Sequence, residues 1–151
     1  IFRNLSVKSN ILGVAERNFL KKEDLINFYQ NTIKEFGLES IEDSMGYVLS
    51  GGQRRKVEIA RCLASKPKLI LLDEPFAGID PLAIEDIKNV LKSLADKGIC
   101  ILITDHNLRE TIDICNYSIV IKDGSILDKG EKDYLINSSL IKEEYFGTVF
   151  D

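Results

Sequence analysis

The first third of the chain carries apolar side chains at helical spacing. Val7, Ile11 and Val14 recur three to four residues apart behind Ser6, a residue that commonly caps helices. A second apolar stripe ends at Gly37, where a helix typically stops. The expected helices of this part cover residues 6–17, 23–36, 40–44 (one turn) and 51–65.

The pattern changes after Pro67. Two short continuous apolar runs, "LILLD" at 69–73 and "CILIT" at 100–104, are typical of parallel strands buried on both faces. The stretch 82–97 between them has a helical stripe and is followed by Gly98. The order strand, helix, strand predicts a βαβ unit.

The remaining residues continue this alternation. We expect a helix over 107–115, and two strands within 117–130 joined by a tight Asp123-Gly124 turn. Short helices should follow in the tail, 131–147. The fold class is therefore α/β, with a parallel sheet core and a helical segment before it. The expected organisation is a helical subdomain (1–66), an α/β core (67–130) and a helical tail (131–151).

Composition narrows the class of protein. With 44% apolar and 29% charged residues, the chain is an ordinary soluble globular domain. A net charge of −4 argues against a general nucleic-acid-binding surface, so we expect no nucleic-acid partner. No apolar run approaches the roughly 18 residues of a membrane span. The three cysteines are scattered without metal-ligand spacing and read as reduced thiols.

The stretch "VLSGGQRRKVEIA" (48–60) suggests an anion site. Ser50 occupies the expected N-cap of a helix, and Gly51 and Gly52 follow it. The first N–H groups of a helix lack partners and carry partial positive charge, and two glycines let an anion approach them closely. We therefore interpret Ser50, Gly51, Gly52 and Gln53 as a phosphate cup. The alternative is an ordinary serine N-cap followed by a glycine turn.

Polar side chains follow both predicted strands. Asp73 ends the first strand at its carboxyl end, where α/β sheets bind ligands, and is a candidate Mg²⁺ ligand. Glu74 comes next and is a candidate general base. His106, the single histidine, follows the second strand and is a candidate donor to a terminal phosphate. The alternatives are a plain turn and a structural histidine. Asp80, before Pro81, should also cap the following helix.

Together these motifs carry a family resemblance. "LSGGQ", "LILLDEP", "GIDP" and "ITDH", in that order, resemble the signature, Walker B, D-loop and switch-histidine motifs of ABC ATPases, whose nucleotide-binding domain has a P-loop NTPase fold. The resemblance implies ATP and Mg²⁺ as cofactors. It makes Asp73 the Mg²⁺ ligand, Glu74 the general base, His106 the γ-phosphate switch and Asp80 the acid that crosses a dimer interface.

The same resemblance implies two kinds of partner. In this family the cup formed by Ser50, Gly51, Gly52 and Gln53 binds the γ-phosphate held by the other subunit of a dimer, so a homodimer is expected. Integral-membrane transporter subunits dock a coupling helix in a groove near the position of Phe2, Arg3 and Leu5. The alternative for Phe2 is a buried side chain at an ordinary helix start. The implied location is the cytoplasmic face of the inner membrane.

Further segments of the sequence are most similar to the lipopolysaccharide-export ATPases of Gram-negative bacteria, notably "DSMG", "PFAGIDP", "HNLRET" and the tail "EEYFGTVF". Branched-chain amino-acid importers share part of it and form an alternative. A DNA-repair type of ABC ATPase would show heptad runs or a basic stripe, and neither is present. A truncated, non-catalytic ABC protein that acts only as a binding module is a further alternative.

One family motif is absent from these residues. No Gly-Lys-Ser or Gly-Lys-Thr occurs, so there is no phosphate loop of the form G-x-x-x-x-G-K-[ST]. The adenine-stacking aromatic and the Q-loop glutamine would also lie before Ile1. We therefore expect these 151 residues to be the C-terminal part of the domain, with no ATPase activity on their own.

Overall fold

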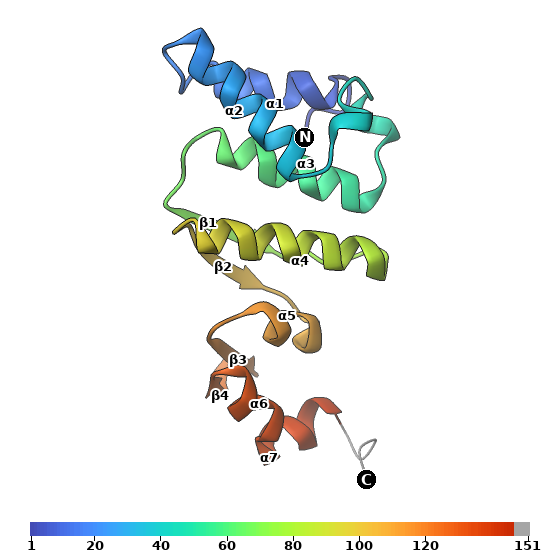
Figure 1. Ribbon diagram of the computed structural model, residues 1–151. Coiled ribbons are helices and arrows are strands. Elements are labelled where there is room, and N and C mark those ends of the chain that lie inside the picture. Colours follow the sequence, from blue (N-terminus) through green and yellow to red (C-terminus); the bar gives the residue numbers. More distant parts are fainter. Residues whose placement is uncertain (147–151) are drawn as a thin grey trace. The chain divides into compact units, whose positions relative to one another are not determined.

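A computed structural model describes residues 1–146, and the side chains as far as Glu144. It separates into two compact units, one covering Ile1–Thr104 and the other beginning at Asp105. Both combine helices with strands (Figure 1). The last four residues of the tail motif "EEYFGTVF" lie outside the described residues. Within 1–146, no helix is long and apolar enough to cross a membrane.

The helices at the start of the first unit form where their capping residues predict. The Ser6 hydroxyl accepts a hydrogen bond from the Ser9 N–H at 3.1 Å, and Gly37 adopts the left-handed conformation (φ 59°) just after the second helix. The elements are α1 (Val7–Ala15), α2 (Lys22–Glu35), the 3₁₀ turns η1 (Glu39–Ile41) and η2 (Gly46–Val48), and α3 (Gly51–Leu63). The predicted positions of the three α-helices are confirmed.

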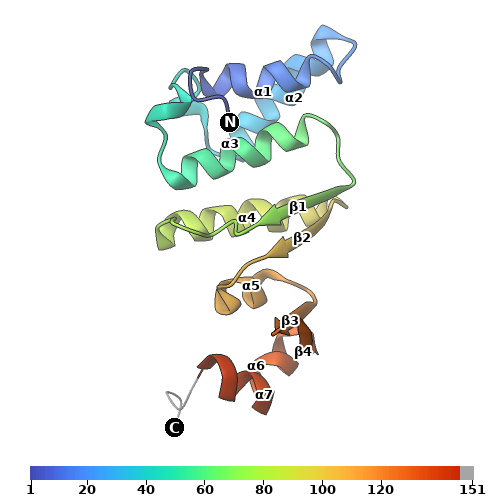
Figure 2. The same cartoon turned by 180° about the vertical axis from the view of Figure 1, so that it is seen from behind.

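Helix α3 packs against both α1 and α4 (Pro81–Asp96), and all three can be followed from the opposite side in Figure 2. Its buried side chains include Val57, Ile59 and Ala60. The fully buried large side chains that precede α3 in the chain include Val7, Ile11, Phe36 and Leu38. Burial of this apolar surface is the main term that holds the helices together.

The predicted βαβ unit is confirmed. Strands β1 (Leu69–Asp73) and β2 (Cys100–Thr104) pair in parallel, in a register that sets Asp73 beside Thr104. Asp80 caps α4, with its Oδ1 accepting from the Ala83 N–H at 3.0 Å, and Pro81 takes the first helical position. The connecting helix packs against β2.

The prediction that these strands are buried on both faces is wrong for this structure. Ile70 is buried, but Leu71 on the opposite face is 67% exposed, and Leu69 and Leu102 are at least half exposed. The reason is that α4 covers one face of the two-stranded sheet, and alternate side chains of a strand point to opposite faces.

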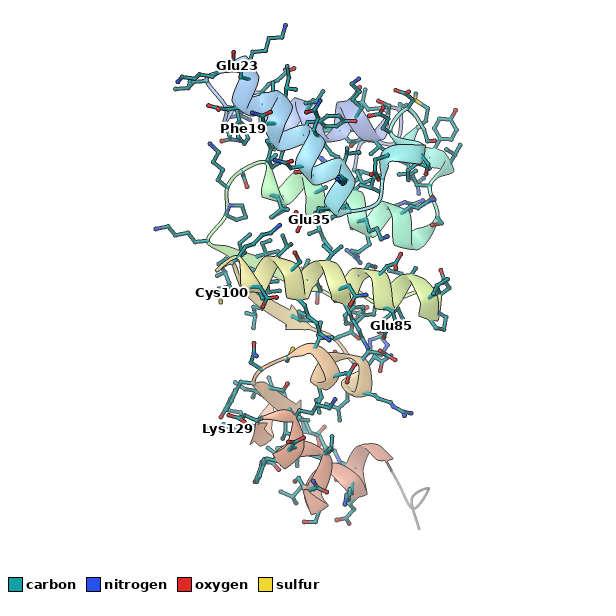
Figure 3. All side chains as sticks on the ribbon, viewed as in Figure 1. Phe19, Glu23, Glu35, Glu85, Cys100 and Lys129 are labelled. Carbon is teal, nitrogen blue, oxygen red and sulfur yellow. The ribbon has the colours of Figure 1, made fainter. Side chains whose placement is uncertain are left out.

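Side-chain contacts also tie the helical part to the βαβ part. Glu35 ends α2, and its position is labelled in Figure 3. One oxygen of its carboxylate, Oε1, accepts hydrogen bonds from the Ser93 hydroxyl at 2.8 Å and from the Lys97 ammonium at 2.5 Å, at the end of α4. The predicted boundary at residue 66 therefore falls inside one compact unit, and the assignment of subdomains stays a prediction.

The second unit is built around a hairpin. Strands β3 (Ser118–Lys122) and β4 (Ser125–Gly130) are antiparallel, and Asp123 (φ 49°) and Gly124 (φ 76°) make the predicted two-residue turn. Its core consists of Ile112, Val120, Leu135 and Ile141. The helical elements are α5 (Leu108–Ile114), α6 (Lys132–Asn137), α7 (Ser139–Ile141) and the π-helical turn η3 (Lys142–Phe146).

Candidate functional site

The acidic end of β1 is held by the neighbouring strand. Because β1 and β2 are in parallel register, Asp73 and Thr104 are paired, and the Thr104 hydroxyl donates to Asp73 Oδ1 at 2.6 Å. Both residues lie at the carboxyl end of the sheet and are exposed. This hydrogen bond orients the carboxylate through Oδ1, so that Oδ2 is the oxygen that can bind a cation.

Glu74 adopts an unusual backbone conformation. Its φ of 44° is in the left-handed region, which costs a residue with a side chain about 1–2 kcal/mol. Its N–H donates to the Thr104 carbonyl at 2.7 Å, and its carbonyl accepts from the Ala77 N–H at 3.3 Å. Such a conformation persists only where the surroundings fix it, and residues of this kind concentrate at functional sites.

The Ser50 to Gln53 turn forms a complete capping box at the start of α3. The Gln53 N–H donates to Ser50 Oγ at 3.2 Å, and the Ser50 N–H donates to Gln53 Oε1 at 3.0 Å. This is the ordinary N-cap that the sequence offered as an alternative. A capping role does not exclude an anion, because the helix N-terminus keeps its partial positive charge.

The two glycines of this turn have different surroundings. Gly52 is buried, and a Cβ built on it would lie 2.5 Å from the Ala83 Cβ of α4. Gly51 is exposed, and its Cβ would lie 3.2 Å from the Gly78 carbonyl oxygen. The close packing of α3 on α4 is thus a reason for glycine at position 52 that the sequence alone did not reveal.

The remaining predicted site residues fall in both units. Asp80 lies in the first unit and caps α4 as predicted. His106 lies in the second unit, two residues beyond the end of β2. Its side chain is 74% exposed, and its Nδ1 lies 3.8 Å from Oδ1 of Asp105. An exposed imidazole is accessible to a ligand, whereas a structural core histidine is not.

The N-terminal loop (residues 1–5) presents apolar side chains to solvent. Phe2 is 60% exposed, with the Arg61 guanidinium 4.9 Å from the centre of its ring, so the alternative of a buried helix-start Phe is wrong for this structure. Leu5 of the same loop is 42% exposed. Further exposed apolar side chains add to this surface: Met45, and Tyr47 and Val48 of η2.

Asn10 fixes this loop, and the sequence reasoning missed it. The side chain is buried: its Oδ1 accepts from the Phe2 N–H at 2.8 Å, and the two N–H groups of its Nδ2 are shared among the carbonyls of Phe2, Leu5 and Ser6 at 3.0–3.1 Å. A polar residue between Val7 and Ile11 on an apolar helix face was the available signal. Thr104 was missed as well, since its role follows from strand register.

The residues present offer one carboxylate to the Mg²⁺ of a magnesium nucleotide. Within residues 1–146, no group of three His, Cys, Asp or Glu side chains forms a metal cluster. Asp73, oriented by Thr104, supplies that single carboxylate. That matches Mg²⁺, which is typically held by one or two carboxylates together with water and substrate phosphates.

Comparison with known proteins identifies the family. A family model described as ABC transporter matches residues 1–77, about half of the chain. The chain belongs to the ABC transporter family. An α/β fold of the ABC type was predicted from the motifs, and similarity to solved structures of this family confirms that fold class.

Two relatives and one structure illustrate the similarity. The lipopolysaccharide export system ATP-binding proteins LptB of Haemophilus influenzae and Escherichia coli K12 are each 44% identical over 99% of this chain and 63% of their own length. The structure of cbiO1 from Clostridium perfringens, part of the ABC transporter complex cbiONQ, has a TM-score of 0.82 at 28% identity, over 93% of this chain and 56% of that one. This chain thus spans less than two thirds of the length of each of these ABC family members.

Proposed function

We propose that this chain is part of the ATP-binding and hydrolysing subunit of an ABC transporter that powers lipopolysaccharide export. The observation that carries the ATPase proposal is the acidic strand end, where Asp73 is oriented by Thr104 and Glu74 is held in a left-handed turn. The cargo rests on the 44% identity to proteins named for lipopolysaccharide export.

In this proposal Asp73, Glu74 and His106 have distinct roles. Asp73 would hold Mg²⁺, which neutralises charge on the phosphates of ATP when it is bound. Glu74 accepts the proton of the attacking water as the general base. The exposed imidazole of His106 donates to charge developing on the terminal phosphate.

The Ser50 to Gln53 turn would act on the nucleotide of a second subunit. The N-terminus of α3, with the unsubstituted backbone of exposed Gly51, suits a phosphate carried by a partner in a homodimer. Asp80, at the N-cap of α4, would lie at the same dimer interface. Dimerisation is then required for turnover, because each site is completed by the other copy.

The exposed N-terminal loop would dock the membrane subunits. Phe2, Arg3 and Leu5 would receive a coupling helix, which places the protein at the cytoplasmic face of the inner membrane. The exposure of Phe2 and Leu5 beside the exposed side chains of Tyr47 and Val48 supports this proposal, because exposed apolar patches mark interaction sites. Asn10 would keep the loop in its docking conformation through the hydrogen bonds of its side chain.

The test is Glu74→Gln in the intact protein. The substitution keeps the side-chain shape but removes the base, so turnover should fall at least about 100-fold while ATP binding persists. Turnover is measured by phosphate release, and binding by calorimetry. Near-normal turnover would remove Glu74 from its role as base.

The cargo needs its own experiment. The gene should restore growth of a Gram-negative strain depleted of its lipopolysaccharide-export ATPase, provided that it is expressed with its own membrane subunits. The Glu74→Gln variant is the matched control and should not restore growth. An active ATPase that restores branched-chain amino-acid uptake instead would redirect the proposal to an importer.

A further inference from the structure

Arg55, on the second turn of α3, contacts the turn that contains Glu74. Its Nη2 donates to the Glu74 carbonyl at 3.1 Å, and its Nε donates to the Pro75 carbonyl at 3.3 Å. Its Nη1 donates to Glu58 Oε2 at 2.8 Å, one turn further along the same helix. The guanidinium thus joins α3 to the residue proposed as the general base.

We propose that Arg55 is a positioning residue that fixes the backbone of Glu74 and couples it to the Ser50 to Gln53 turn. The proposal rests on the function proposed for Glu74. The planar guanidinium has donors along two edges, so one edge can span two successive carbonyls while the other is held by a carboxylate. Glu58 provides that carboxylate and thereby sets the plane of the guanidinium.

The conformation of Glu74 explains why such a contact is needed. A left-handed residue with a side chain is kept in place only by several fixed contacts. The Thr104 carbonyl holds the Glu74 N–H from the sheet side, and Arg55 holds the Glu74 carbonyl from the helix side. Without Arg55 the peptide after Glu74 loses charge-assisted hydrogen bonds, and the Glu74 carboxylate is free to turn away from a bound substrate.

The position of Arg55 on α3 adds a second consequence. Gln53 at the start of this helix belongs to the turn proposed to receive the phosphate of a partner subunit, and Arg55 follows it by two residues. Any shift of α3 on phosphate binding therefore acts directly on the backbone of Glu74. Arg55 thus links the helix that would receive one subunit's nucleotide to the proposed base of the other subunit.

The experiment compares four variants of the intact protein with the wild type and with Glu74→Gln by steady-state ATP hydrolysis. Arg55→Ala should lower kcat about 10- to 100-fold, with KM changed by less than about threefold, because misplacement of a reacting group acts on the chemical step. Arg55→Lys retains the charge but lacks the two-carbonyl fork, so its kcat should fall between those of Arg55→Ala and the wild type.

Lys56→Ala is the matched control. Lys56 is the next residue on α3 and pairs with Asp86 of α4 at 2.8 Å, so it also links α3 to the βαβ part, but through α4 rather than through the carbonyls of Glu74 and Pro75. Its kcat should stay within about twofold of the wild type. An equal fall in kcat for Lys56→Ala and Arg55→Ala would overturn the inference, because loss of any contact between α3 and the βαβ part would then suffice.

The fourth variant combines Arg55→Ala with Glu74→Gln. If Arg55 acts through Glu74, the double variant should have the same residual turnover as Glu74→Gln alone. A further fall by the full factor seen for Arg55→Ala would show that Arg55 acts independently of Glu74, and the inference would be wrong. If Arg55→Ala does not fold, Arg55→Lys and the double variant built on it decide the question.

Failure of this inference and failure of the proposed function are distinguishable. Near-normal turnover in Glu74→Gln rejects the proposed base, whatever Arg55 does. A large loss in Glu74→Gln with an unchanged kcat in Arg55→Ala rejects only the positioning role.

Discussion

The substitution Gly52→Ala tests whether the packing of α3 on α4 requires a glycine. The added Cβ would lie 2.5 Å from the Ala83 Cβ, well short of the roughly 3.5–4.0 Å at which carbon atoms make favourable contact. Both atoms sit directly on helix backbones, so no rotamer change can relieve the clash. The helices must separate, and overpacking of this kind costs about 1–3 kcal/mol.

Alanine also improves the helix propensity, which offsets at most about 1 kcal/mol. We therefore expect Gly52→Ala to lower the free energy of unfolding by roughly 1–2 kcal/mol. With a urea m-value of about 2 kcal/mol/M, the unfolding midpoint falls by roughly 0.5–1 M. Unfolding is followed by circular dichroism without nucleotide, so that lost phosphate binding cannot contribute.

Gly13→Ala is the matched control. Gly13 lies within α1, and nothing approaches within 4 Å of a Cβ built on it. This substitution should raise the midpoint, because alanine replaces a helical glycine without a clash, for a gain of roughly 0.5–1 kcal/mol. The two Gly→Ala changes are thus expected to have opposite signs.

A double-mutant cycle identifies the clashing partner. Ala83→Gly removes the atom that the new Cβ meets, so the pair Gly52→Ala and Ala83→Gly should show a favourable coupling of about 1 kcal/mol or more. A rise in the midpoint for Gly52→Ala, or no coupling to Ala83, would refute the packing explanation. The glycine would then be required by its phosphate or by another contact.

Two further predictions concern the surface and the helical part. Phe2→Ala in the intact protein should weaken assembly with the membrane subunits by about 2 kcal/mol or more and leave the ATPase activity of the soluble protein unchanged. Assembly is measured by pull-down. Unchanged assembly, or an equal loss of ATPase activity, would contradict this prediction. Burial, together with the hydrogen bond from the Tyr29 hydroxyl to Glu42, raises the pKa of Tyr29. The unfolded chain therefore loses this proton at lower pH than the folded protein does, and above about pH 10 the free energy of unfolding should fall by up to about 1.4 kcal/mol per pH unit. Urea unfolding at several pH values measures this fall, which should be smaller in Tyr29→Phe. Equal slopes for the variant and the wild type would contradict the prediction.

Local chemistry in the sequence determined where most elements begin and end. The strands at 69–73 and 100–104 and the Asp123-Gly124 turn were predicted and are confirmed. So were the caps at Ser6 and Asp80. The caps and the turn depend on contacts within about four residues along the chain or on an intrinsic φ preference, and neighbouring residues in the sequence carry that information. The strands were predicted from short continuous apolar runs.

The sequence also determined the family, because its motifs occur in a fixed order. The identity of the residues at the strand end and at the start of α3 predicted a nucleotide site, and the family match is consistent with that prediction. The individual roles of Asp73, Glu74, His106 and the Ser50 to Gln53 turn stay predictions until the substitutions are made.

Only the tertiary structure decided which groups hold the site residues in place. Asp73 and Thr104 are 31 residues apart, and Arg55 lies 19 residues before Glu74. The same holds for the approach of Gly52 to Ala83, which requires two helices to be packed. These contacts join atoms of separate elements, and no local spacing specifies which elements meet. Buried polar groups and crowded glycines acquire their partners only when the apolar faces of the elements have been packed together.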